Sequence, residues 1–112
     1  MADSAVDTVT VPAQMPGVSV AVLGAGKMGG ILLQAFLKQN LFAPEQIHAT
    51  VAHAERAMAL STQWGVDVGT DNVEAVRNAD LVLVGVKPFQ VPELIEQIRP
   101  VLTPSKTIVS FA

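Results

Sequence analysis

The chain has 112 residues, of which 50% are hydrophobic, and its formal net charge is −3 at pH 7. This composition predicts one folded domain with a substantial core and excludes extensive disorder. The mild negative charge and dispersed Lys and Arg disfavour nucleic acid or an anionic membrane as a partner. The absence of cysteine excludes disulfides, thiolate metal sites and cysteine nucleophiles.

Residues 1–17 are expected to form a loose leader before a folded domain of 18–112. The chain shows neither an apolar run of membrane-spanning length nor the basic start and apolar centre of a secretory signal. We therefore expect a cytoplasmic protein. The first element is a strand over 18–23, almost continuously apolar, as is typical of a strand buried on both faces of a parallel sheet.

A glycine motif follows this strand at once. Gly24, Gly26 and Gly29 have the spacing Gly-x-Gly-x-x-Gly, and a helix over 27–39 opens behind them. Gly24 permits a tight turn, Gly26 lets the backbone approach a pyrophosphate, and Gly29 lets the helix pack near the strand. The helix N-terminus adds N–H groups and a positive dipole end. The motif with both flanks predicts dinucleotide binding.

The helix over 27–39 has one apolar face, made of Met28, Ile31, Leu32, Ala35 and Phe36.

Strands and helices then alternate to the end. A short helical turn is expected at Pro44, a strand over 47–51, and a helix over 54–64 that ends at Gly65. The elements expected after it are a strand over 66–68, a helix over 72–78, a strand over 81–84, a helix opened by Pro92, and a strand over 107–111.

Two of these later helices carry further signals. Asp71 is expected to be the N-cap of the helix over 72–78, with Glu74 completing a capping box. The helix opened by Pro92 has an apolar face of Val91, Leu94, Ile95 and Ile98.

The alternation predicts an α/β domain with a doubly wound, mostly parallel sheet. The apolar final strand would be exposed with nothing after it, which is a liability at a sheet edge. We therefore expect either a longer natural chain or cover from another subunit.

The end of the second strand bears on the choice of cofactor. NAD-binding folds place Asp or Glu about twenty residues past the glycines, but no carboxylate lies there, and Glu55 suits the helix N-terminus. Thr50, His53 and Arg56 could contact a 2′-phosphate, so NADP(H) is favoured and NAD(H) is possible. Alternatively, Arg56 is a solvated helix charge and His53 an ordinary loop residue.

No metal site is expected, because His48 and His53 lack companion carboxylates or thiols.

From residue 18 onward the chain resembles the N-terminal, cofactor-binding domain of pyrroline-5-carboxylate reductase. The shared motifs are Gly24-Ala25-Gly26-Lys27-Met28, Thr70-Asp71-Asn72, Ala79-Asp80, Gly85-Val86-Lys87-Pro88 and Val109-Ser110-Phe111-Ala112. This family reduces the imine of 1-pyrroline-5-carboxylate to proline with NADPH or NADH. The resemblance implies a Rossmann-type domain, an imine reductase of proline biosynthesis and a homo-oligomeric full-length protein.

The resemblance also implies cofactor contacts. They fall on the loop Leu23, Gly24, Ala25, Gly26, Lys27 and Met28, on Thr50, on Asn72, on Gly85, Val86, Lys87 and Pro88, and on Phe111 and Ala112. Alternatively, Pro88 only ends a strand, Lys87 is a solvated charge and Asn72 only assists the cap at Asp71. Thr50, Val51 and Ala52 stand where the family often has Ser followed by Asn or Arg.

The family's helical C-terminal domain supplies the substrate pocket and the dimer interface. Those groups would lie beyond Ala112, so the 112 residues alone are expected to turn over little substrate, and no catalytic residue is assigned. Two alternatives stay open. The Gly-x-Gly-x-Met-Gly spelling also resembles β-hydroxyacid dehydrogenases, and the domain could instead be a non-catalytic nucleotide-binding module.

Overall fold

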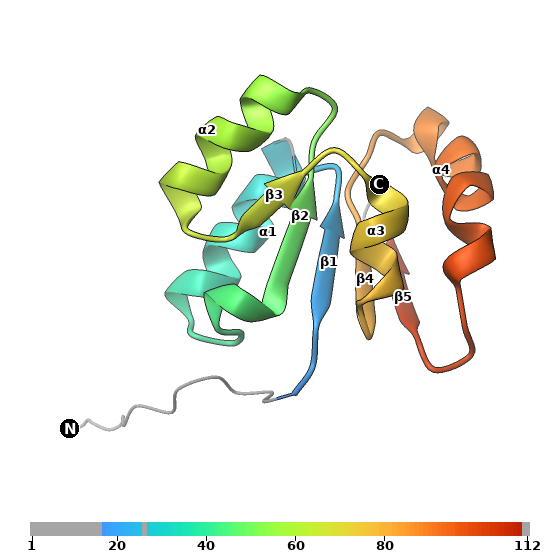
Figure 1. Ribbon diagram of the computed structural model, residues 1–112, viewed down its shortest axis with the longest axis horizontal. Helices are drawn as coiled ribbons and strands as arrows, with labels where there is room; N and C mark the ends of the chain where they lie inside the picture. The colour runs from blue at the N-terminus through green and yellow to red at the C-terminus, as the bar shows by residue number, and fades with distance from the viewer. Residues whose placement is uncertain (1–16, 26, 111–112) are drawn as a thin grey trace.

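A computed structural model describes residues 17–25 and 27–110 (Figure 1). The side chains of Lys27 and Met28 are not part of this description, although their backbone is. Apart from Gly17, the expected leader lies outside the described residues.

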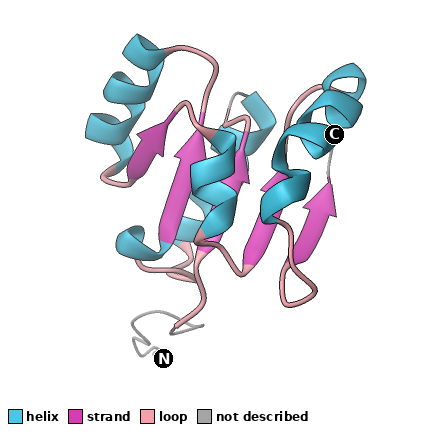
Figure 2. Cartoon of the chain, turned by 45° about the vertical axis from the view of Figure 1, so that its right-hand side comes forward, coloured by secondary structure: helices cyan, strands magenta, loops and turns pink. Residues whose placement is uncertain are grey.

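A five-stranded sheet of order β3-β2-β1-β4-β5 forms the centre of the described chain. Its strands are β1 (Val20–Leu23), β2 (Ile47–Thr50), β3 (Asp67–Gly69), β4 (Leu81–Val84) and β5 (Thr107–Ser110). All neighbouring pairs are parallel, and the arrows point the same way in Figure 2. The predicted doubly wound α/β class is therefore confirmed.

Helices cover both faces of the sheet. The helices are α1 (Lys27–Lys38), α2 (Ala54–Trp64), α3 (Asn72–Arg77) and α4 (Val91–Ile98), with short 3₁₀ turns η1 (Pro44–Gln46), η2 (Pro88–Gln90) and η3 (Arg99–Val101). On one face α1 and α2 pack against Val20 and Val22, while on the other α3 and α4 pack against Ala21 and Leu23. The alternation of side chains along β1 thus supplies two separate apolar cores.

Most element bounds agree with the sequence predictions to within one or two residues. The helix over 54–64 and the strand over 81–84 are confirmed without change. The first strand begins at Val20 rather than at residue 18, and the third is 67–69 rather than 66–68. The end of the predicted strand over 107–111 lies outside the described residues, because β5 is described only to Ser110.

The predicted apolar face of α1 is wrong by part of a turn. Ile31 is 64% exposed and Ala35 is exposed as well, whereas Leu33 is fully buried against the sheet. Leu32, Phe36 and Leu37 flank Leu33 and are partly buried. With Leu, Ile and Phe spread around the helix, the sequence pattern alone did not fix its rotation.

The expected helix ends at Gly65 and Asp71 are both found. Gly65 caps α2 in the left-handed conformation, with φ 72°, and the Asp71 carboxylate accepts a hydrogen bond from the Glu74 N–H at 3.1 Å. The Glu74 carboxylate, however, contacts Arg77 and Asn78. Among the described hydrogen bonds there is none from the Asp71 N–H to the Glu74 carboxylate. The structure therefore shows the first of the two capping-box bonds, which the Asp71 side chain accepts.

Within the described ranges, no helix is long and apolar enough to cross a bilayer.

Candidate functional site at the carboxyl edge of the sheet

The strand order places a crossover point between β1 and β4. From β1 the chain winds to β2 and β3 on one side, then returns to β4 and β5 on the other (Figure 1). The segments that leave β1 and β4 therefore diverge from adjacent strands. In open α/β sheets, ligands bind outside the carboxyl ends of the strands at such a point.

The first glycine of the motif sits at this point in a turn that only glycine fits. Gly24 has φ +77°, and a Cβ on it would lie 2.6 Å from Cγ1 of Val86 and 3.0 Å from the Val86 backbone nitrogen. Val86 follows β4, so the segment after β4 closes directly on the turn after β1. Sequence reasoning gave Gly24 a tight turn but did not identify Val86 as the side chain that presses on it.

The third glycine brings α1 onto the same turn. A Cβ on Gly29 would lie 2.6 Å from the Gly24 carbonyl oxygen. The first turn of α1 therefore packs against the backbone of the glycine turn, as the motif predicts. This packing directs the N-terminus of α1, whose first N–H groups have no partner within the helix, to the carboxyl edge.

Thr50, the last residue of β2, binds the glycine turn from the opposite side. It is 1% exposed. Its hydroxyl accepts a hydrogen bond from the Gly24 N–H at 3.2 Å and donates one to Asn72 Oδ1 at 2.5 Å. Its carbonyl accepts from the Ala25 N–H at 2.7 Å. The N–H groups of Gly24 and Ala25 are thus engaged within the protein.

Asn72 connects Thr50 to the far side of the site. Asn72 is the first residue of α3 and is half-buried, and its Nδ2 donates to Gln97 Oε1 on α4 at 3.1 Å. The N-cap belongs to Asp71, so Asn72 is not needed for that role. Sequence reasoning missed Gln97, because no motif or spacing marks one glutamine on the polar face of α4.

The start of α2, which follows β2, carries exposed polar groups. His53 is the N-cap residue of α2 and makes no side-chain cap hydrogen bond. Arg56 and Glu55 are exposed in the first turn of the same helix. His48 lies back within β2, where its Nδ1 is 3.4 Å from the Asp67 carboxylate on β3.

The segment after β4 is held by backbone contacts. The Gly85 N–H donates to the Leu23 carbonyl at 2.8 Å, and the Lys87 N–H donates to Gln90 Oε1 at 3.1 Å. The Lys87 side chain is exposed, and Pro88 begins η2. Pro88 therefore starts a helical turn and does not end the strand, because β4 already ends at Val84.

The structure thus brings most of the expected residues to one edge of the sheet. The glycine turn, Thr50, Asn72 and the segment after β4 are in contact, whereas His53 and Arg56 stand outside on α2. Gly26, Phe111 and Ala112 lie outside the described residues, as do the side chains of Lys27 and Met28. Within the described ranges, no three His, Asp or Glu side chains are grouped as metal ligands.

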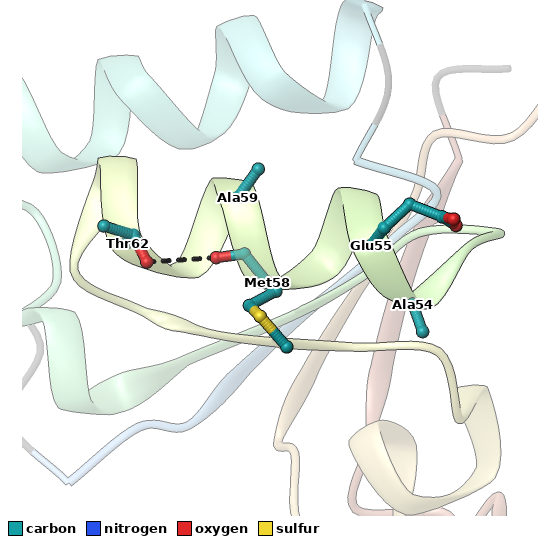
Figure 3. A pocket seen from close by; sticks show the side chains of 5 residues that line it. All are labelled: Ala54, Glu55, Met58, Ala59 and Thr62. Atoms are coloured by element: carbon teal, nitrogen blue, oxygen red, sulfur yellow. Dashed lines mark hydrogen bonds between the residues drawn. The ribbon is translucent and has the colours of Figure 1, made fainter.

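A shallow depression lies on α2. It is lined by Ala54, Glu55, Met58, Ala59 and Thr62 (Figure 3), all from one helix, and the Thr62 hydroxyl is bonded to the Met58 carbonyl at 3.1 Å. Met58 is 73% exposed. Since its lining comes from a single helix, this depression has no convergent polar groups of the kind that fix a ligand.

Comparison with known proteins agrees with this geometry. Residues 19–112 match the family model described as NADP oxidoreductase coenzyme F420-dependent. The chain is 31% identical over 98 residues to the pyrroline-5-carboxylate reductase of Methanosarcina acetivorans, which covers 88% of this chain and 36% of that protein. It is 34% identical over 93 residues to the enzyme of Pseudomonas aeruginosa, covering 83% and 34%.

A solved structure shares the fold. The crystal structure of Plasmodium falciparum pyrroline carboxylate reductase with NADP bound superposes with a TM-score of 0.72 at 22% identity, covering 86% of this chain and 34% of that one. The chain thus spans about a third of the length of the relatives it matches. It belongs to the family described as NADP oxidoreductase coenzyme F420-dependent, and the resemblance to pyrroline-5-carboxylate reductase is confirmed.

Proposed function

We propose that this chain binds NADP(H) at the carboxyl edge of its sheet and serves a reductase of 1-pyrroline-5-carboxylate. The observation that carries the proposal is the glycine turn at the crossover point, held by Thr50 on one side and Val86 on the other. The sequence relationship to pyrroline-5-carboxylate reductases supports the choice of reaction. When bound, NADPH supplies a hydride, which adds to the imine carbon while the nitrogen gains a proton.

The described residues fit a pyrophosphate in a specific way. Because Gly24 and Ala25 direct their N–H groups to Thr50, they shape the turn rather than donate to a phosphate. The N–H groups left for the phosphates are then those of the first turn of α1, which begins at Lys27. We infer that two sets of residues have different roles here. The residues that shape the turn are Leu23, Gly24, Ala25 and Thr50. The residues that approach the ligand are Gly26, Lys27, Met28 and Gly29.

The second strand ends without a carboxylate that would repel a 2′-phosphate. Thr50 is buried there, and Val51, Ala52 and His53 follow it. We propose that Arg56 and His53, exposed at the start of α2, face the 2′-phosphate with the helix N-terminus behind them. Glu55 in the same turn opposes this charge, so we expect the preference for NADPH over NADH to rest mainly on Arg56.

The nicotinamide half of the dinucleotide is assigned to the segment after β4. Gly85, Val86, Lys87 and Pro88 line the edge next to the glycine turn, and Phe111 and Ala112 follow β5 in the sequence. We propose that this segment orients the nicotinamide ring, because it leaves the strand adjacent to β1. The gain from such positioning is that the reacting atoms are held near attack distance.

The single tryptophan makes cofactor binding directly measurable. Trp64 is the only tryptophan, and the chain has no tyrosine. Titration with NADPH and separately with NADH, followed by Trp64 emission and by calorimetry, is expected to give binding of both with NADPH tighter. Binding of neither nucleotide, or tighter binding of NADH, would contradict the cofactor assignment.

The reaction is tested separately from the cofactor. The protein produced from its native gene is expected to oxidise NADPH only when 1-pyrroline-5-carboxylate is added, and to form proline in equal amount. NADPH binding without this reaction would be consistent with the cofactor site but would contradict the proposed reductase activity.

The other expectations stay predictions. These are a cytoplasmic location, a folded domain of 18–112, a homo-oligomeric full-length protein, a small-molecule substrate, and no nucleic-acid or membrane partner.

A further inference from the structure

We infer that Gln97 is a positioning residue for the nucleotide-binding turn, acting through Asn72 and Thr50. The expected effect on nucleotide binding rests on the proposed NADP(H) function. The hydrogen bonds behind the inference do not depend on that function. Four groups form one continuous chain of hydrogen bonds: the Gly24 N–H, the Thr50 hydroxyl, the Asn72 amide and Gln97 Oε1. They come from the β1–α1 turn, β2, α3 and α4.

The two ends of the Asn72 side-chain amide differ, and this difference gives the chain of hydrogen bonds a direction. An amide has a donor nitrogen and an acceptor oxygen. Because Gln97 Oε1 accepts from Asn72 Nδ2 at 3.1 Å, the Asn72 oxygen must face Thr50. With its oxygen toward Asn72, Gln97 therefore stabilises the orientation in which the Asn72 oxygen meets the Thr50 hydroxyl.

The orientation of the Asn72 amide in turn decides how the Thr50 hydroxyl bonds to the glycine turn. A hydroxyl has one proton to donate and two lone pairs. With the Asn72 oxygen beside it, the proton goes to Asn72 and a lone pair accepts the Gly24 N–H. If the amide were turned over, the hydroxyl would face two donors, and its own proton would lack this acceptor at a residue only 1% exposed.

Gln97 is well placed to hold this orientation. Its neighbour Ile98 is fully buried, and Leu94 one turn earlier is 5% exposed, so the backbone of α4 is fixed against the sheet. Gln97 is itself at the exposed side of the helix, where the bond to Asn72 is its recorded side-chain contact. It can therefore be replaced without disturbing the core.

The first test compares the NADPH affinity of three variants with that of the parent by titration of Trp64 emission. Gln97→Met removes the acceptor at similar length and is expected to weaken NADPH binding about fivefold. Gln97→Glu keeps an oxygen acceptor and should retain most of the affinity when measured at moderate salt. Gln63→Met, the same change at an exposed site on the last turn of α2, is expected to leave affinity unchanged.

A double mutant shows whether Gln97 acts through the chain of bonds. In a Thr50→Val background the connection to Gly24 is already broken, so Gln97→Met should add no further loss. Additive losses would overturn the proposed route. Equal NADPH affinity for Gln97→Met and the parent would overturn the inference while leaving NADP(H) binding intact. If the parent itself binds no NADPH, the proposed function fails and the effect on binding fails with it.

Hydrogen exchange of single amides tests the same chain of hydrogen bonds without any nucleotide. Gln97→Met is expected to speed exchange of the Gly24 amide about fivefold. The Gly85 amide, which donates to the Leu23 carbonyl at the same edge, serves as the internal reference and should not change. Unchanged exchange at Gly24, or equal acceleration at both amides, would overturn the positioning role even if the variant were less stable overall.

Discussion

Val86 closes against Gly24 so tightly that its Cγ1 lies 2.6 Å from where a Cβ on Gly24 would stand. The contact joins the segment after β4 to the turn after β1, the two adjacent strands between which the chain reverses its winding. The glycine is thus required by a neighbouring protein side chain and by its φ of +77°, quite apart from any ligand. This relationship makes the first prediction.

Replacing Gly24 with alanine is expected to destabilise the fold by about 3 kcal/mol, since a left-handed backbone strain is added to a clash with Val86. Gly65→Ala is the matched control, because Gly65 has φ 72° with nothing within 4 Å of its Cβ position. It should cost only about 1 kcal/mol. Urea unfolding followed by Trp64 emission gives both values, and equal losses would show that Val86 moves aside freely.

The two adjacent glycines of α1 should differ in how strongly the same change destabilises the fold. A Cβ on Gly29 meets the Gly24 carbonyl oxygen at 2.6 Å, whereas one on Gly30 meets the Trp64 ring at 3.3 Å. Gly29→Ala is expected to lose about 2 kcal/mol, because backbone cannot give way as a side chain does. Gly30→Ala should stay within about 1 kcal/mol of the parent, since alanine's better helix propensity offsets the contact. A larger loss for Gly30→Ala than for Gly29→Ala would contradict this packing.

The rotation of α1 can be tested at two of its side chains. Leu33 is fully buried, so Leu33→Ala should cost about 2–5 kcal/mol. Ile31 is 64% exposed, and Ile31→Ala should change stability by no more than about 0.5 kcal/mol. Urea unfolding of the two variants would give the reverse order if the face predicted from the sequence pattern were the buried one.

Local signals predicted the elements well, and they failed where a side chain's direction mattered. Gly65 and Asp71 end and begin helices through their own backbone and side-chain chemistry, so position in the sequence is sufficient to find them. The rotation of α1 depends instead on which of several apolar side chains meets the sheet. Leu33 and Ile31 are chemically alike, and only the packed structure distinguishes them.

The site shows the same division. The glycine spacing predicted the turn, because the spacing itself is the geometric requirement. Thr50 was expected to reach outward to a phosphate, but its hydroxyl is engaged with Gly24 and Asn72. Gln97 could not be anticipated, since its contact with Asn72 joins two helices that are brought together only by the winding of the sheet.

The nucleotide preference gives the last prediction. Arg56 is exposed in the first turn of α2, just beyond the carboxyl end of β2. Arg56→Gln is expected to weaken NADPH binding about tenfold, because a charge-assisted contact to the 2′-phosphate is lost, and to leave NADH binding nearly unchanged. Arg77→Gln, at an exposed arginine on the last turn of α3, is the control for the change in net charge. Calorimetric titration of both nucleotides into the three proteins would reject the assignment if Arg56→Gln weakened NADPH and NADH equally, or if Arg77→Gln matched its effect. The first result would place Arg56 beside a part common to both nucleotides, and the second would reduce its role to long-range charge.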